Sequence, residues 1–121
     1  MSDIKLSRRR QEAIRRCQHE FEEVRAELED IDFVLQGSVT ERRMVCGKPG
    51  CRCHRESDAR HGPYYQWSWK SRGRTHSVYL TQEQADLCKQ WVQNNRRMEK
   101  VMKRLRRISL RAAHLHQIPS K

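Results

Sequence analysis

The sequence predicts an α+β protein in which two long helices form an antiparallel coiled-coil hairpin, with a small three-stranded antiparallel β module between them. Two segments carry apolar residues every three and four positions, and the segment between them alternates aromatic and polar residues. Only 36% of the 121 residues are hydrophobic and 34% are charged. A chain this polar cannot assemble a large core. It is expected to fold through narrow apolar seams between helices and to need an additional cross-link such as a bound metal ion.

The first helix is predicted over residues 7–35, a stretch that contains neither glycine nor proline. Its apolar positions are Ile14, Cys17, Phe21, Val24, Leu28, Ile31 and Leu35. They keep an a/d heptad spacing over three heptads, which is typical of a coiled coil. Gly37 follows, where a glycine commonly ends a helix. Residues 1–37 are therefore predicted to form an N-terminal coiled-coil helix.

Residues 38–80 are predicted to form the β module, with strands over residues 39–45, 64–70 and 75–80. The second strand, YYQWSWK, alternates between aromatic and polar side chains. Residues 71–74, SRGR, would turn the second strand into the third. Three short strands are rarely stable alone, so this module is expected to need a staple.

The alternation of the second strand places Tyr65, Trp67 and Trp69 on one face of the module. Aromatic rings among arginines could stack nucleic-acid bases. Packing of Trp67 and Trp69 against the helices is favoured over that alternative. Tyr64 and Tyr79, on the opposite face, are then the better candidates for exposed contacts.

The C-terminal part, residues 81–121, is predicted to be a basic helix and tail. Thr81 can cap the helix and Gln84 can complete a capping box. The apolar stripe continues to about Leu115 and has a polar residue, Asn95, at a core position, where it would fix the register. Its main positions are Cys88, Trp91, Asn95, Met98, Met102 and Leu105.

The two stripes can be laid antiparallel because the segment between the helices is short. In this register Leu28 faces Trp91 and Ile14 faces Leu105, and every a/d position finds an a/d partner. The small side chains of Cys17 and Cys88 then lie in the seam rather than at a ligand site.

Three cysteines, Cys46, Cys51 and Cys53, fall within eight positions in the segment CGKPGCRC. Thiolates at this spacing favour a metal site over an iron–sulfur site or a redox thiol, and Zn²⁺ takes four ligands in a tetrahedron. The fourth ligand is His54 or His61. Adjacent side chains diverge, which would strain joint binding by Cys53 and His54, so His61 is favoured. Zinc enclosed by four protein ligands leaves no open position for catalysis, and no enzymatic activity is predicted.

The redox environment agrees with a metal site. The N-terminal segment MSDIKLSRRRQEA has no apolar run that could serve as a signal peptide, and no stretch approaches the roughly 20 apolar residues of a membrane span. A cytoplasmic location without a membrane partner is therefore expected, and thiols stay reduced there. Five cysteines are also an odd number, which argues against a complete disulfide framework.

The run CGKPGCRC followed by HGPYY, a short strand pair and a basic helix resembles a family of small uncharacterised bacterial and phage proteins. These proteins share the pattern CGK-x-x-C-x-C and HGPYY and are often found among mobile-element genes. The resemblance covers roughly residues 37–107. It implies that Cys46, Cys51, Cys53 and His61 carry the shared site, and it brings no settled activity.

The net charge of +11 favours a polyanionic partner. We therefore expect a non-catalytic zinc protein that binds nucleic acid, with DNA favoured over RNA, as an accessory or regulatory factor. The alternative is a coiled-coil adaptor that binds another protein or a second copy of the chain, with a purely structural zinc. The bases expected to contact nucleic acid are Arg8, Arg9, Arg10, Arg15, Arg16, Lys48, Arg52, Arg55, Arg60, Arg72, Arg74, Arg96, Arg97, Lys100, Lys103, Arg104, Arg106 and Arg107.

Overall fold

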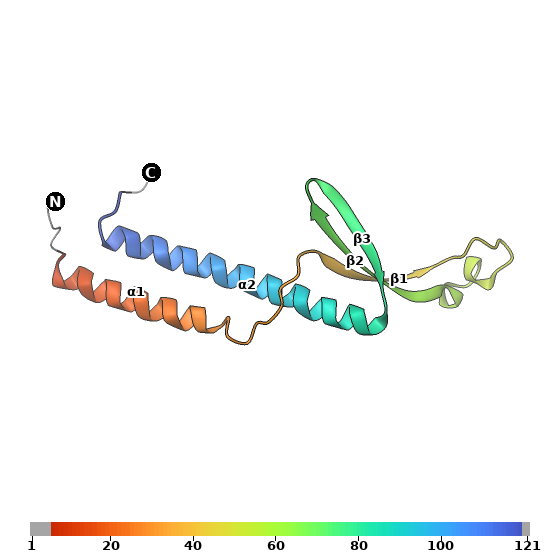
Figure 1. The fold of residues 1–121 in the computed structure, drawn as a ribbon, viewed down its shortest axis with the longest axis horizontal. Helices are drawn as coiled ribbons and strands as arrows, with labels where there is room; N and C mark the ends of the chain where they lie inside the picture. The colour runs from red at the N-terminus through yellow and green to blue at the C-terminus, as the bar shows by residue number, and fades with distance from the viewer. Residues whose placement is uncertain (1–5, 120–121) are drawn as a thin grey trace. The chain divides into compact units, whose positions relative to one another are not determined.

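The computed structural model describes residues 6–119 and has the predicted α+β content, with two helices and a three-stranded antiparallel sheet (Figure 1). In chain order the elements are α1 (Arg8–Ala26), β1 (Ser38–Met44), η1 (Arg52–His54), η2 (Ser57–Ala59), β2 (His61–Ser71), β3 (Arg74–Leu80) and α2 (Gln82–Leu115). The chain divides into two compact units. Unit 1 holds the residues up to Asp32 and those from Arg96 onward, and unit 2 is Phe33–Asn95.

Helix α1 begins as predicted, because the Ser7 hydroxyl accepts a hydrogen bond from the Arg10 N–H at 3.2 Å. The predicted end was wrong: α1 stops at Ala26, nine residues before Leu35, and Glu27 is its C-cap. Beyond that point the heptad spacing continues in the sequence, but the N–H groups of Leu28, Glu29 and Ile31 bond to carbonyls three residues earlier, as in turns, and the α-helical pattern is lost.

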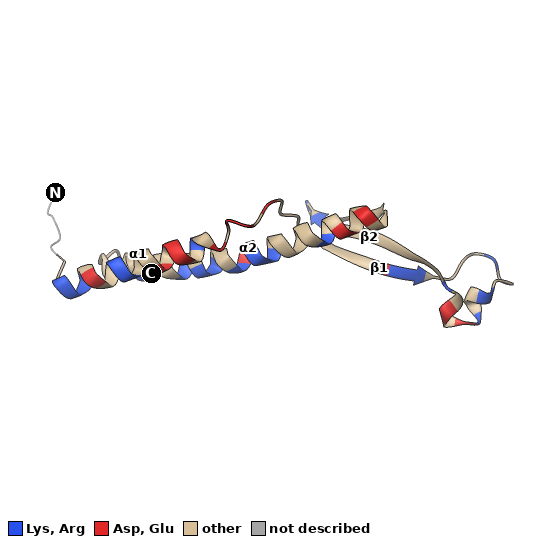
Figure 2. Cartoon of the chain, turned by 90° about the horizontal axis from the view of Figure 1, so that it is seen from below, with Lys and Arg blue, Asp and Glu red and all other residues tan. Residues whose placement is uncertain are grey.

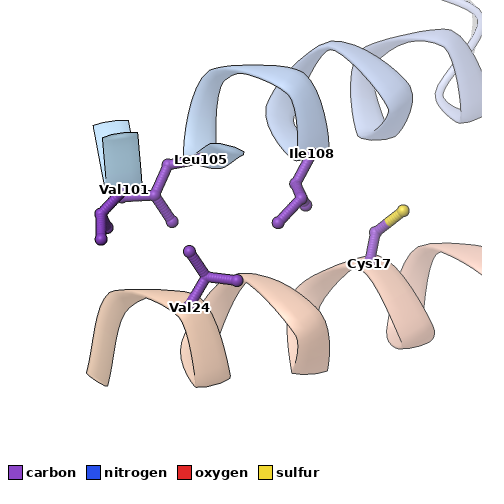
Figure 3. Close-up of a cluster of buried hydrophobic side chains, with 5 residues drawn as sticks. All are labelled: Cys17, Val24, Val101, Leu105 and Ile108. Carbon is purple, nitrogen blue, oxygen red and sulfur yellow. The ribbon is translucent and has the colours of Figure 1, made fainter. Parts of the chain in front are cut away.

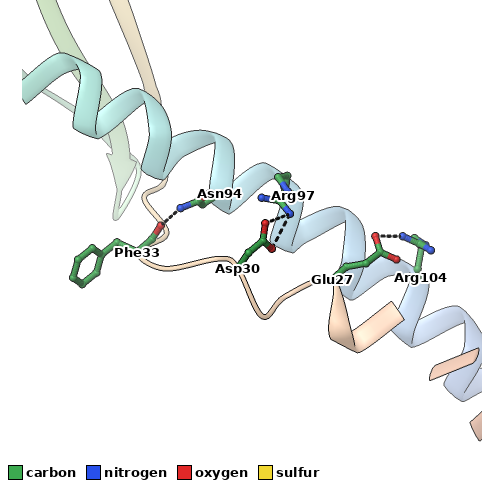
Figure 4. A network of polar contacts seen from close by, with 6 residues as sticks. All are labelled: Glu27, Asp30, Phe33, Asn94, Arg97 and Arg104. Carbon is green, nitrogen blue, oxygen red and sulfur yellow. Dashed lines mark hydrogen bonds and ion pairs between the residues drawn. The ribbon is translucent and has the colours of Figure 1, made fainter. Parts of the chain in front are cut away.

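In unit 2, contacts with α2 hold the segment that was expected to be helical. The Leu35 N–H donates to the Trp91 carbonyl at 3.1 Å. The Asn94 side chain donates to the Phe33 carbonyl at 3.0 Å (Figure 4). The Phe33 ring also meets the Trp91 ring edge-on, with centroids 5.2 Å apart. These tertiary contacts replace the hydrogen bonds of a continuing helix.

Gly37 does not cap the helix but allows a close approach to β2. Its φ of +105° is in a region that favours glycine. A Cβ here would collide with the Ser68 carbonyl oxygen and lie 2.9 Å from Nε1 of Trp67. The chain can therefore enter β1 directly beside β2.

The core of unit 1 is a cluster of small and medium apolar side chains from α1 and α2 (Figure 3). It consists of Cys17, Val24, Val101, Leu105 and Ile108. Larger neighbours, including Phe21, Leu28 and Met102, are only partly buried against it. Cys17 and Cys88 are both buried. Both also lie outside the cysteine cluster, as expected.

The helices pair in a different register from the predicted one, which places Glu27 opposite Val92. In the structure Glu27 pairs with Arg104, twelve positions further along α2, and Glu20 pairs with Arg111. The early end of α1 accompanies this shift. Residues 27–30 form turns and residues 31–36 have no helical or strand structure, so this part of the connection does not keep the roughly 1.5 Å rise per residue of a helix.

The sheet has the order β1-β2-β3 with antiparallel neighbours; β1 begins and ends one residue earlier than predicted, and β2 and β3 are longer than predicted. Arg72 (φ +53°) and Gly73 (φ +74°) form the predicted two-residue hairpin turn. Two positive φ values correspond to a type I′ turn. The Trp67 and Trp69 rings stack with centroids 3.8 Å apart, as expected for side chains on one face.

Helix α2 begins with the predicted capping box. The Gln84 N–H donates to the Thr81 hydroxyl at 3.2 Å, and the Thr81 N–H donates to the Gln84 side chain at 2.9 Å. The helix ends at Leu115, and Asn95 is buried, both as predicted. Within residues 6–119, neither helix has an apolar stretch long enough to cross a membrane.

Candidate metal centre and basic surfaces

The sheet brings the two sides of the cysteine–histidine site together. Cys46 follows the end of β1 by two residues, and His61 is the first residue of β2. The β1–β2 register pairs Met44 with His61, so the end of one strand lies beside the start of the other. Cys51 and Cys53 come from the connecting segment around η1. The ligand atoms of these two cysteines, Cys46 and His61 all lie within 4.8 Å of one another.

Two distances within this cluster are close to the edges of a metal tetrahedron. The sulfur atoms of Cys46 and Cys53 are 3.6 Å apart, and the Cys51 sulfur is 3.4 Å from Nε2 of His61. Bond lengths to a tetrahedral zinc imply an S–S edge of about 3.8 Å and an S–N edge of about 3.6 Å. The four residues can therefore hold a metal ion of this size.

Electrostatics make one thiol of the cluster ready to bind a cation. The backbone N–H of Cys53, followed by the hydrogen bond to His61, lowers the pKa of the Cys51 thiol to about 6. Burial raises the pKa of the Cys53 thiol, and its sulfur accepts a hydrogen bond from the Cys46 N–H at 3.3 Å. Cysteine binds a metal as the thiolate, and backbone N–H groups directed at sulfur stabilise that state.

Of the two histidines that the sequence left open, His61 joins the cluster. Nε2 of His54 instead donates to the Cys46 carbonyl oxygen at 2.8 Å. The His54 ring thus ties η1 to the strand end that precedes the site. This contact was not predicted, because the carbonyl of Cys46 lies eight positions before His54 in the sequence and only the folded loop brings it next to the His54 ring.

Gly62 is required by the site geometry and was missed in the sequence. Its φ is +129°, and a Cβ would lie 2.7 Å from the Arg42 carbonyl oxygen. The Gly62–Pro63 peptide bond is cis. Gly47 and Gly50, by contrast, have no positive φ, and a Cβ added to either would meet no atom within 4 Å. The loop that carries Cys46, Cys51 and Cys53 therefore does not require glycine at position 47 or 50.

Three bases of α2 form salt bridges to acids of α1 or of the turn after it, and Figure 4 shows two of these pairs. Figure 2 shows the basic and acidic positions along the two helices. Arg97 contacts Asp30 at 3.0 Å, Arg104 contacts Glu27 at 2.8 Å, and Arg111 contacts Glu20 at 2.9 Å. They are spaced by seven residues and so form one row along the helix. Arg97 and Arg104 were expected to contact nucleic acid, but both are engaged within the chain. We call this row the bridge row.

A second row on α2 has no salt-bridge partner within residues 6–119. Its members are Arg96, Lys100, Lys103 and Arg107, all of which are exposed. Spacings of four, three and four residues place them on one helix face, over about 16 Å of helix. We call this row the basic ridge.

The other predicted contacts are spread over separate parts of the chain. Arg52 is paired with Glu56 at 2.7 Å. The exposed bases comprise two groups on α1, one group around the metal centre, a pair at the β2–β3 turn and one further base on α2, namely Arg8, Arg9, Arg15, Arg16, Lys48, Arg55, Arg60, Arg72, Arg74 and Arg106. Arg10, also in the first turn of α1, is half-buried.

A family model described as a domain of unknown function (DUF6788) matches residues 5–90. The matched segment includes α1, the whole metal centre and the first part of α2. It begins earlier and ends earlier than the resemblance noted in the sequence. No curated protein and no solved structure matches the chain.

Proposed function

The chain belongs to the DUF6788 family, and we propose that it is a non-catalytic protein that binds nucleic acid and is stapled by zinc. The preferred partner is DNA, and the role is that of an accessory or regulatory factor. A link to a mobile element of bacteria or phages follows from the resemblance of the CGKPGCRC and HGPYY segments.

The proposed metal is zinc because of the donor set. Three thiolates and one imidazole at tetrahedral spacing are typical of structural zinc sites, whereas calcium and magnesium prefer oxygen ligands. Cys51 and His61 alone would resemble a nucleophile pair. However, two further sulfur atoms lie within 4.8 Å of them, which suits a shared cation better than an attacking thiolate. With all four ligands from the protein, the metal would have no open position for a substrate.

The observation that carries the nucleic-acid proposal is the division of the α2 bases into two rows. In an antiparallel coiled-coil hairpin, the bridge row flanks the apolar seam and is neutralised by acids of α1 and of the turn after it. The basic ridge lies about 135° around the helix from Val101, Leu105 and Ile108, at roughly 100° per residue. Four neighbouring cations there repel one another, and a row of phosphates would relieve that repulsion.

The first turn of α1 adds a second group of unfavourable charges. It contains Arg8, Arg9 and Arg10 and no acidic residue. The N-terminus of a helix carries a partial positive charge, so arginines there are locally destabilising and a bound anion is stabilising. Phosphate contacts at this turn would supplement those of the basic ridge.

Two triple variants with the same change in net charge test the proposal. The ridge variant neutralises three of the four ridge bases by Lys100→Gln, Lys103→Gln and Arg107→Gln. The bridge variant removes the whole bridge row by Arg97→Gln, Arg104→Gln and Arg111→Gln. If each ridge residue contacts one phosphate of duplex DNA, the slope of log affinity against log salt should become shallower by about 2.7. The bridge variant should keep the slope but lose on the order of 1 kcal/mol of stability.

Equal effects of the two variants would mean that only net charge matters and that the ridge is not the contact. If the wild-type protein shows no salt-sensitive binding to any nucleic acid, the adaptor function replaces this proposal. The adaptor is favoured by a hollow of about 360 Å³ in unit 1, whose lining combines apolar side chains such as Ile14, Phe21 and Ile108 with polar and charged ones. A protein partner or a second copy of the chain could fill it.

A further inference from the structure

Three rings are stacked across the β2–β3 hairpin. The Trp67 and Trp69 centroids are 3.8 Å apart with planes 18° from parallel. The Trp69 and His76 centroids are 5.3 Å apart with planes 21° from parallel. Trp69 and His76 are direct cross-strand partners, so the sheet register holds the third ring in place.

The two ends of this stack differ in what surrounds them. At the first end, Nε1 of Trp67 donates to the Gln36 carbonyl at 2.8 Å, which anchors that ring to the chain. Trp67 and Trp69 are both half-buried. His76 at the other end is exposed, and it lines a surface hollow of about 610 Å³.

The remaining lining of the hollow is basic. Arg72 and Arg74 contribute to it together with Ser71. Arg72 occupies the first central position of the type I′ turn with φ +53°, where asparagine, aspartate or glycine is usually preferred. An arginine in this conformation is locally unfavourable, and its charge lies beside the open end of the ring stack.

We propose that the tip of the β2–β3 hairpin is a base-stacking site for an unpaired nucleotide. The nucleobase stacks on the outer face of His76, as a fourth ring of the stack, and Arg72 and Arg74 bind the adjacent phosphates. This inference rests on the proposed nucleic-acid binding. It adds that unpaired bases, as in single strands, are the preferred ligand of the hairpin tip. It also moves the aromatic contact from the exposed Tyr64 and Tyr79 to the opposite face of the sheet.

The test compares two single-stranded probes that have equal charge. One is an oligothymidylate and the other is an abasic oligonucleotide of the same length, both measured at the same salt concentration. The wild-type protein should bind the base-bearing probe at least about five-fold more tightly, because each stacked base contributes affinity independently of phosphate contacts. His76→Ala should abolish this preference, and His76→Phe should retain it, since a phenyl ring can stack without the imidazole.

Tyr79→Ala is the matched control, because Tyr79 is an exposed ring on the other face of β3 and should leave the preference unchanged. Thermal melting checks that each variant is folded. Equal binding of the two probes by the wild-type protein would overturn the stacking site while leaving phosphate binding intact. Loss of the preference in Tyr79→Ala but not in His76→Ala would also overturn it. Absence of binding to both probes and to duplex DNA would instead refute the proposed function itself.

Discussion

Gly62 offers the sharpest test of how the sheet holds the metal centre, through the substitution Gly62→Ala. An alanine with φ near +129° is strained by about 1–3 kcal/mol. Its Cβ would also lie 2.7 Å from the Arg42 carbonyl oxygen, so β1 must move, which costs about 1 kcal/mol if one hydrogen bond is lost. The sum is about 2–4 kcal/mol, or roughly 30- to 1,000-fold in an equilibrium constant.

Most of this cost should appear as lost zinc affinity. The strand end can relax in the metal-free protein, whereas the metal-bound form needs His61, the neighbour of Gly62, beside Cys46. Affinity is measured by competition with a chromophoric chelator. Gly47→Ala is the control and should bind zinc like the wild-type protein, because its Cβ meets no atom within 4 Å. If Gly62→Ala binds zinc within about threefold of that control, the close approach of the strands does not support the site.

Two further predictions concern the histidines and the start of α2. His61→Ala removes a ligand and should reduce zinc content to a small fraction of that of the wild-type protein. His54→Ala removes only the bond to the Cys46 carbonyl and should cost at most about 10–100-fold in affinity; retention of zinc by His61→Ala and its loss by His54→Ala would exchange their roles. Thr81→Ala should lower the free energy of unfolding by about 1 kcal/mol in chemical denaturation, because it breaks one bond of the capping box. The same loss on changing the neighbouring Gln82 to alanine would show that the cap is not responsible.

The four residues of the candidate metal centre could be predicted from the sequence because their chemistry and local spacing restrict the choice. Cys46, Cys51 and Cys53 are close along the chain, and a tetrahedral ion needs only one more donor. The choice of His61 over His54 followed from the divergence of adjacent side chains. What supports the site could not be predicted in this way. The positive φ of Gly62 and the contact between His54 and the Cys46 carbonyl depend on strand register and loop path, which no local pattern encodes.

The end of α1 shows why a strong pattern can still mislead. The apolar spacing continues through Ile31 and Leu35, and no glycine or proline interrupts it. The chain nevertheless leaves the helix after Ala26, because Phe33 packs on Trp91 and the Leu35 N–H bonds to the Trp91 carbonyl. Heptad spacing records that a residue is apolar at a given interval. It does not record whether a helix or an extended segment delivers that residue to its partner.

The same loss of register hid the division of charge on α2. Arg97 and Arg104 are seven residues apart, but so are Arg96 and Lys103, and each pair adjoins a predicted seam position. From the sequence, either row could therefore face α1. The choice depends on the rotation of the helix, which the burial of the Val101 side of α2 determines. That rotation turns Arg97 and Arg104 toward Asp30 and Glu27, the acids that follow α1, and turns Arg96 and Lys103 away. Cations that the fold does not neutralise are the ones available to a ligand, so the packing of the seam itself selects the surface on which the proposed phosphate contacts are made.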